Sequence, residues 1–331
     1  MDDYMKIGRI INKSIRKFAR EKGFALLLVL IAVITLFQII NKHYLSVNNI
    51  RNILIAASLS GTLAVGIGCM LIAGMPDLSA GAVGCMGGLL MALFLRSGMG
   101  WVPAMVLSLI YGAIAGAMNA FFINQFRMMP FIATLAMSSV WRGMGNIITD
   151  NQSIAISNVV FNNIGSTWVL GMPLPFVIML CLYIIYGLIL KYTKFGRSIY
   201  MVGGNRMAAR LAGISIKKVM TILMINCSVI ASLGGAILAG RMHSAHPSSV
   251  HGTQLTGIIA SCLGGISFGG GAGGMLGGFI GLMLLNFFNN GLTIAGLSSY
   301  WQIVASGLLL ILALTVDYIN GRVRLRVLKV K

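Results

Sequence analysis

The chain has 331 residues, of which 57% are hydrophobic and only 9% are charged. A soluble globular protein carries about 25% charged residues. This composition therefore excludes a soluble globular protein and predicts an integral membrane protein. The charge is one-sided, with 25 Lys and Arg against 6 Asp and Glu, a net +19. In a soluble chain this balance would suggest a nucleic-acid partner, but in a membrane protein it first suggests the positive-inside rule.

Apolar runs along the chain predict about ten transmembrane helices and an all-α fold. The runs cover 24–40, 50–73, 79–95, 102–123, 130–149, 174–190, 217–240, 253–268, 274–290 and 300–318. A helix needs about 20 residues to cross the hydrocarbon, and several of these runs are shorter or hold Gly and Pro. We therefore expect a transmembrane domain over 23–318, between a basic segment at 1–22 and a basic tail at 319–331.

The basic residues gather in three segments. Nineteen of the 25 lie in 1–22, 191–218 and 319–331, and an even number of spans places all three on one side. The positive-inside rule makes that side the cytoplasm, so both termini should be cytoplasmic and should meet anionic lipid instead of nucleic acid. Segment 1–22 reads either as an amphipathic helix on the membrane surface or as a disordered basic tail. The opposite side holds few basic residues: Lys42, Arg51, Arg96, Arg142 and Arg241.

A small-residue pattern occurs twice at a fixed offset. A Gly-x-x-x-Gly pair followed by Asn lies at 112–124 and again 165 residues later, at 277–289. Transporters are commonly built from two such repeats with the pathway between them, so we expect an internal two-fold repeat. The alternative is a chance match between glycine-rich helices.

One acidic residue interrupts a long apolar region. In 74–81, Pro76 disfavours helix, whereas Asp77 and Ser79 favour a new helix start and predict a broken helix. Asp77 is therefore either a helix cap or a residue of the pathway, and the two roles are compatible. Asp77 and Asp150 are the only acids between Glu21 and Asp317, which argues against a carrier coupled to protons or sodium ions.

The basic segment at 191–218 contains a short predicted helix. Asn205 is a suitable N-cap and Gly213 a suitable residue just past the C-terminus, with Arg206 and Arg210 one turn apart between them. Such a helix could dock onto a cytoplasmic partner, and a plain inner loop is the alternative.

Five stretches together resemble a known family. The segments 76–81, 204–214, 263–271, 288–292 and 298–302 are similar to motifs in the permease subunits of bacterial ATP-binding-cassette importers of the ribose type, a branch related to branched-chain amino-acid permeases. The resemblance runs from about 45 to 318 in a consistent order. It departs from the family at Arg206, where we would expect an acid, and at Pro76, where an aliphatic residue is more usual.

The resemblance implies a multi-subunit transporter in the bacterial cytoplasmic (inner) membrane. Two permeases, identical or unlike, would form the channel above two ATPase subunits, and a periplasmic or lipoprotein binding protein would deliver the solute. The chain has no G-x-x-x-x-G-K-[ST] run, so ATP and Mg would bind the partner ATPase, and this chain would be neither an enzyme nor a cofactor carrier. The residues expected to couple to the ATPase are Gly203, Gly204, Asn205, Arg206, Ala209, Arg210 and Gly213.

A sugar pathway favours amides, hydroxyls and aromatic faces. The candidates are Asp77, Ser79, Asn119, Asn124, Asn289, Asn290 and Trp301. Asn and Trp also serve as packing and interface residues in membrane helices, which is the competing interpretation.

Three functions remain open at this level. The first is import of a sugar or similar small polar solute, the second is the same machinery for an amino acid, nucleoside or signalling molecule, and the third is a secondary carrier or channel. His243, His246 and His251 lie near one another in an outer polar loop, where pH sensing, contact with a binding protein and metal binding are all conceivable.

Overall fold

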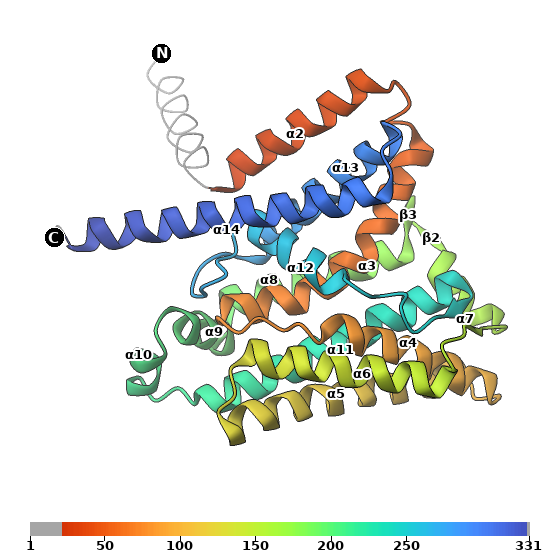
Figure 1. The fold of residues 1–331 in the computed structure, drawn as a ribbon, viewed down its shortest axis with the longest axis horizontal. Coiled ribbons are helices and arrows are strands. Elements are labelled where there is room, and N and C mark those ends of the chain that lie inside the picture. The colour runs from red at the N-terminus through yellow and green to blue at the C-terminus, as the bar shows by residue number, and fades with distance from the viewer. Residues whose placement is uncertain (1–21, 330–331) are drawn as a thin grey trace, which may run out of the picture.

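The computed structural model describes residues 22–329, so the predicted basic segment 1–22 lies, apart from Lys22, outside the described residues. Within that range the chain is mostly helical, with thirteen helices. In chain order they are α2 (Lys22–Ile40), α3 (Val47–Ile72), α4 (Ala80–Arg96), α5 (Trp101–Phe126), α6 (Pro130–Thr149), α7 (Val159–Ser166), α8 (Leu174–Tyr192), α9 (Lys194–Gly204), α10 (Arg206–Leu211), α11 (Ile216–Met242), α12 (Thr253–Leu263), α13 (Met275–Ile294) and α14 (Ser299–Lys329). Figure 1 shows most of the long helices running across the molecule in roughly one direction.

Four strands of two residues each complete the described fold. β1 (Ile154–Ala155) pairs antiparallel with β4 (Ser244–Ala245), and β2 (Trp168–Val169) forms a hairpin with β3 (Met172–Pro173). These pairs tie together the segments that join α6 to α8 and α11 to α12. They lie at the end of the molecule opposite α9 and α10 (Figure 1).

Each of the ten apolar runs coincides with one helix. Among the described residues, α3, α5, α8, α11 and α13 are long and apolar enough to cross a membrane, and shorter apolar helices occur in α2, α4, α12 and α14. Two helix ends differ from the prediction. The helix α12 stops at Leu263 because Gly265 takes a left-handed conformation with φ of +83°. The helix α14 runs past residue 318 to Lys329, since no proline interrupts the predicted tail.

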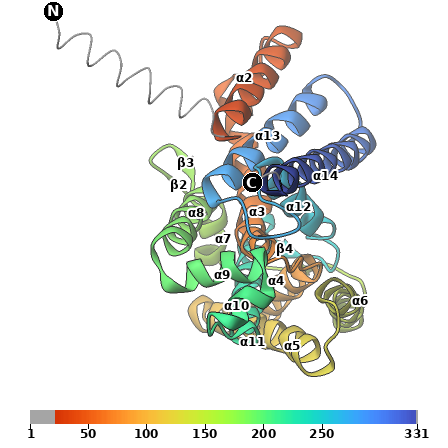
Figure 2. The same ribbon diagram turned by 90° about the vertical axis from the view of Figure 1, so that its left-hand side faces the viewer.

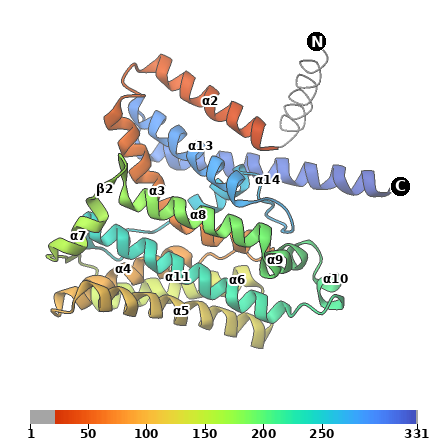
Figure 3. The same cartoon turned by 180° about the vertical axis from the view of Figure 1, so that it is seen from behind.

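The helices α3 and α11 form the centre of the molecule. The apolar stretches of α3 and α11 are 78% and 67% buried inside the protein, the highest values among the five long spans. Small residues permit this packing: a side chain on Gly235 in α11 would overlap the carbonyl oxygen of Gly84 in α4. Figure 3 shows α11 between α5 and α8 on the rear face. Close backbone approach of this kind drives helix association where the surroundings are as apolar as the side chains.

Candidate coupling and transport site

The short helices α9 and α10 lie at one end of the molecule, across the end of α11 (Figure 2). Their boundaries follow local chemistry. The Asn205 side chain accepts from the backbone N–H of Ala208 at 3.0 Å, and Gly213 just beyond α10 has φ of +78°. The predicted cap and stop of this helix are therefore confirmed.

Two large apolar side chains of α10 are exposed. Met207 and Leu211 are one turn apart and are 64% and 83% exposed, whereas Ala209 is fully buried against the rest of the fold. Of the predicted coupling residues, Ala209 thus packs inward, and the two large side chains that reach outward were missed. The signal was present in the sequence as an apolar pair at i, i+4 in a basic segment, a spacing that places both on one helix face.

Three backbone segments meet at extremely short range beneath α10. A Cβ on Gly203 would overlap the carbonyl oxygen of Ile72 at the end of α3. The same carbonyl accepts from the backbone N–H of Gly271 at 2.8 Å. Arg206 donates from Nη2 to the carbonyl oxygen of Gly74 at 3.2 Å. The α9–α10 segment is therefore attached directly to the end of α3 and to the loop between α12 and α13.

Two side chains hold that glycine-rich loop in place. The Tyr200 hydroxyl on α9 donates to the carbonyl oxygen of Gly273 at 2.8 Å. A tyrosine hydroxyl is protonated at neutral pH in any case, and burial raises the pKa of Tyr200 further, so it remains a donor in alkaline solution as well. From α14, Asp317 Oδ2 accepts from Ser267 Oγ at 2.9 Å and from the backbone N–H of Phe268 at 3.2 Å. A displacement of α9 would therefore be passed to this loop and to α14.

Asp77 lies in the non-helical residues between α3 and α4, where it is fully buried. Its Oδ1 accepts from the Ser79 backbone N–H at 2.8 Å and from Ser79 Oγ at 2.7 Å, and Asn119 Nδ2 donates to Ser79 Oγ at 2.8 Å. The other carboxyl oxygen, Oδ2, is buried and has no hydrogen-bond partner among the described residues. The Cys227 thiol lies close to the carboxyl group. Three of the predicted pathway residues thus form one buried polar chain.

The helix α4 starts at the second of the two predicted residues. Ser79 is its N-cap, so Asp77 is not the helix cap, and the Ser79 side chain makes no capping bond. The physical reason is that the Ser79 hydroxyl donates to Asp77 and accepts from Asn119 instead. Asp77 stabilises the turn before the helix by accepting from the backbone of Ser79, two residues on.

The buried Asp77 leads to a prediction. Replacing Asp77 with Ala removes the acceptor of two buried hydrogen bonds and should destabilise the protein by about 1–3 kcal/mol. Asp77→Asn keeps an oxygen in the same place and should retain most of that stability. Thermal unfolding of the purified variants in detergent measures the difference. Equal destabilisation by both variants would show that the negative charge, and not the acceptor oxygen, is what the turn requires.

The remaining predicted pathway residues do not join this chain. Asn124 Nδ2 donates to Thr221 Oγ1 at 3.0 Å near the end that carries α10. Asn290 exchanges two hydrogen bonds with Asn49, at 2.8 and 2.9 Å, while Asn289 keeps a buried side-chain oxygen without a hydrogen bond to the described residues. Trp301 is 59% exposed on α14. The structure therefore places these candidates in separate regions.

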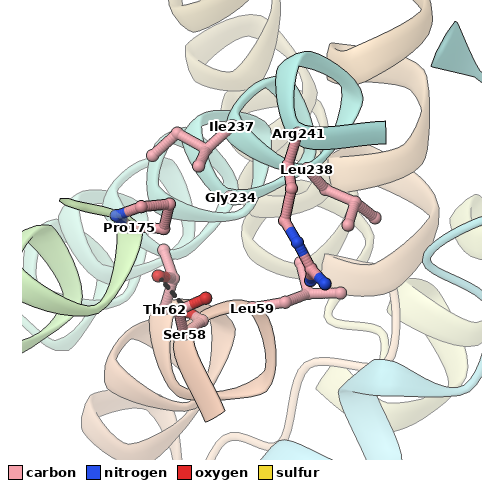
Figure 4. A pocket seen from close by; sticks show the side chains of 8 residues that line it. All are labelled: Ser58, Leu59, Thr62, Pro175, Gly234, Ile237, Leu238 and Arg241. Atoms are coloured by element: carbon pink, nitrogen blue, oxygen red, sulfur yellow. Dashed lines mark hydrogen bonds between the residues drawn. The ribbon is translucent and has the colours of Figure 1, made fainter. Parts of the chain in front are cut away.

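One small cavity lies between the long helices (Figure 4). It is lined by Ser58, Leu59, Thr62, Pro175, Gly234, Ile237, Leu238 and Arg241, from α3, α8 and α11. Its volume of about 10 Å³ is near the least that one water requires. The cavity is therefore far too small for a sugar. Its Ser58 and Thr62 hydroxyls are already used, since they donate to the carbonyl oxygens of Ile55 and Ser58 within α3.

The histidine cluster is locally bonded. His246 Nδ1 lies 2.8 Å from Ser248 Oγ and 3.1 Å from the backbone nitrogen of Ser248, within one turn. In the part of the chain that the structure describes, no group of three or more His, Cys, Asp or Glu side chains could hold a metal ion.

Comparison with known proteins shows the family. Residues 49–314 match the model of the branched-chain amino acid transport system permease component, so the chain belongs to this family of transport permeases. It is 35% identical to the ribose import permease of Bacillus subtilis (strain 168), over 87% of this chain and 90% of that protein. It is also 31% identical to the D-allose transport permease of Escherichia coli (strain K12), over 87% and 89%, and 30% identical to the L-arabinose transport permease of that strain, over 89% and 90%. No solved structure matches the chain. The chain is thus a multi-pass membrane transport subunit, and its relatives are permeases and not enzymes.

Proposed function

We propose that this chain is the transmembrane permease subunit of an ATP-driven importer for a sugar or similar small polar solute. Three similar permeases are named for the transport of ribose, D-allose and L-arabinose, which supports a sugar as the solute. The exposed helix α10, with the preceding helix α9 packed through Gly203 onto the end of α3 and Arg206 bonded just beyond that end, carries the proposal because it offers a partner ATPase a direct connection to the membrane core. In this arrangement the protein lies in the bacterial cytoplasmic membrane with α9, α10 and both termini inside.

The ATPase would grip α10 by its apolar pair. Met207 and Leu211 project from the end of the molecule and suit a cleft on a partner, which would remove their exposed apolar surface from water. ATP and Mg would bind to that ATPase. Closure of two ATPase subunits would displace α9 and α10, and the contacts at Gly203 and Arg206 would pass the movement to α3 and to the glycine-rich loop. Asn205 and Gly213 set the ends of α10, and Arg210 flanks the apolar pair Met207 and Leu211.

We further propose ten spans related by an internal two-fold repeat with inverted topology. The contacts support it: α4 packs on α11 as α12 packs on α3, and α5 packs on α11 as α13 packs on α3. The pairs α4·α6 and α12·α14 correspond in the same way. The non-helical residues at Asp77 would then be the first of two equivalent breaks, with residues 243–252 as the second.

The solute pathway would lie between two permease copies. The cavity beside Arg241 is too small for a sugar, and the polar candidates in this chain are scattered or bonded to one another. The helices α6 and α14 correspond in the proposed repeat, and both expose large apolar side chains. A second copy, identical or unlike, packed on this face would enclose the pathway. An extracytoplasmic binding protein would deliver the solute to it.

Reconstitution tests the proposal. Proteoliposomes containing this permease, its ATPase and its binding protein should take up radiolabelled D-ribose, D-allose or L-arabinose only when ATP is enclosed with the ATPase. Ionophores that collapse proton and sodium gradients should leave the rate unchanged, since few acids are available for ion coupling. Uptake by the permease alone, driven by an ion gradient, would instead identify a secondary carrier, and uptake of amino acids in place of sugars would reassign the substrate class.

A further inference from the structure

Four basic side chains converge on one cavity at the cytoplasmic end. Arg127 follows α5, Arg206 and Arg210 lie on α10, and Lys217 lies in the first turn of α11; all four line a cavity of about 490 Å³. Arg127 belongs to none of the three basic clusters seen in the sequence. Its backbone has φ of +53°, and this left-handed residue ends α5. Folding therefore brings together cations that are up to 90 residues apart in the chain.

The cavity has no acidic side chain to balance these charges. The helices α5, α6, α10 and α11 contain no Asp or Glu. Within the described residues, Arg206 donates to the Gly74 carbonyl oxygen and no ion pair joins any of the four cations to a carboxylate. The lining also contains the Asn124 amide, which donates to Thr221 Oγ1. The positive-inside rule accounts for basic residues on this side but not for their convergence, which costs energy through mutual repulsion until an anion enters.

Exposed apolar side chains adjoin the lining residues in the chain. Phe126 and Met129 flank Arg127 and Met128, and Phe131 and Ile132 follow Pro130 in the first turn of α6; all four side chains are exposed. An anion with fatty chains matches both features, because its phosphate would meet the guanidinium groups and its chains would cover these apolar side chains. A carboxylate-rich protein surface would satisfy only the charge.

We propose that this cavity binds the phosphate group of an anionic membrane lipid. The bound lipid bridges α10 to the end of α5 and the start of α11, so it braces the exposed helix against the membrane-embedded body. This site is separate from the apolar pair Met207 and Leu211, and lipid binding needs neither ATPase nor solute. The proposal therefore stands or fails independently of the transport function.

Lipid binding to the purified full-length permease in detergent tests the site. Phosphatidylglycerol should raise the midpoint of thermal unfolding and remain bound in native mass spectrometry, whereas phosphatidylcholine should do so much less. Replacing Arg127 and Lys217 with Gln should weaken phosphatidylglycerol binding about 30-fold, since each basic residue near anionic lipid contributes about fivefold. Neither residue belongs to the α10 segment, so the variant leaves that helix intact.

The matched control replaces Arg96 and Lys218 with Gln. Lys218 adjoins Lys217 but does not line the cavity, and Arg96 ends α4 away from it, so this variant should bind the lipid as the parent does. The variant with Arg127→Lys and Lys217→Arg keeps both charges and should retain binding, which separates charge loss from misfolding. Equal weakening in the control pair would overturn the site in favour of diffuse attraction. Stabilisation by inorganic phosphate equal to that by phosphatidylglycerol, at matched ionic strength, would overturn the lipid in favour of a soluble anion.

Discussion

Replacing Gly203 with alanine is expected to reduce ATP-driven solute uptake at least tenfold. A methyl group at this position would overlap the carbonyl oxygen of Ile72, which also accepts from the backbone N–H of Gly271. Relief requires α9 to move away from the end of α3, and overpacking of this kind costs about 1–3 kcal/mol. The movement would break the proposed path from the ATPase to the membrane core. Initial uptake rates in proteoliposomes, normalised to the amount of inserted permease, measure the effect.

The neighbouring glycine provides the control. A Cβ on Gly204 would meet nothing nearer than Gly271 Cα at 3.9 Å, an ordinary contact. Gly204→Ala should therefore transport normally. Alanine is the better helix former at both positions, so helix propensity alone would favour both variants equally. Normal uptake by Gly203→Ala would refute the proposed contact between α9 and α3 as the route of coupling.

The second large effect is expected at Leu211. This side chain is 83% exposed at the tip of α10, and we propose that it enters the ATPase cleft together with Met207. Introducing a carboxylate with Leu211→Asp should weaken ATPase binding about 30-fold or more, the effect of losing a central interface anchor of about 2 kcal/mol. The measurement is the amount of ATPase that stays with the permease during purification and the rate of coupled ATP hydrolysis.

Leu170→Asp is the matched control because Leu170 is 90% exposed at the opposite end of the molecule, in the turn between β2 and β3. Leu170→Asp should leave ATPase binding unchanged. At position 211, an apolar replacement, Leu211→Met, should bind the ATPase normally, in contrast to Leu211→Asp. Loss of the ATPase in the Leu170 variant as well would mean that an added negative charge anywhere disrupts assembly, and the role assigned to Leu211 would be wrong.

The two effects separate the steps of coupling. Leu211→Asp should prevent the ATPase from binding, whereas Gly203→Ala should leave it bound and hydrolysing ATP without moving solute. The difference follows from where the residues lie. Leu211 faces outward from α10, and Gly203 lies against the end of α3. Asp317 and Tyr200 hold the adjoining loop, so we expect their replacement to affect the second step.

Much of the architecture follows from the sequence because its determinants are local. The ten apolar runs each became one helix, and Asn205 and Gly213 bound α10 as expected. A run of apolar residues, an N-cap and a left-handed glycine act within about one turn of the chain, so no tertiary information is needed to read them. The family match over 49–314 confirms the class of protein that the motifs predicted.

The candidate site was decided largely by tertiary structure. The sequence singled out Ala209 for a partner, but packing buries it and exposes Leu211 instead. The sequence named Asp77, Ser79 and Asn119 as pathway candidates together with Trp301. Only folding joins the first three in a buried polar chain and leaves Trp301 apart.

The sequence alone thus predicted a helical membrane permease, which the family match confirms. Only the tertiary structure showed that Gly203 touches Ile72 and that Arg127 joins Arg206, Arg210 and Lys217 around one cavity. The physical reason is the distance along the chain over which each feature is determined. Helix boundaries depend on neighbours within a turn, whereas contacts between residues tens to hundreds of positions apart depend on how small side chains let whole helices approach one another.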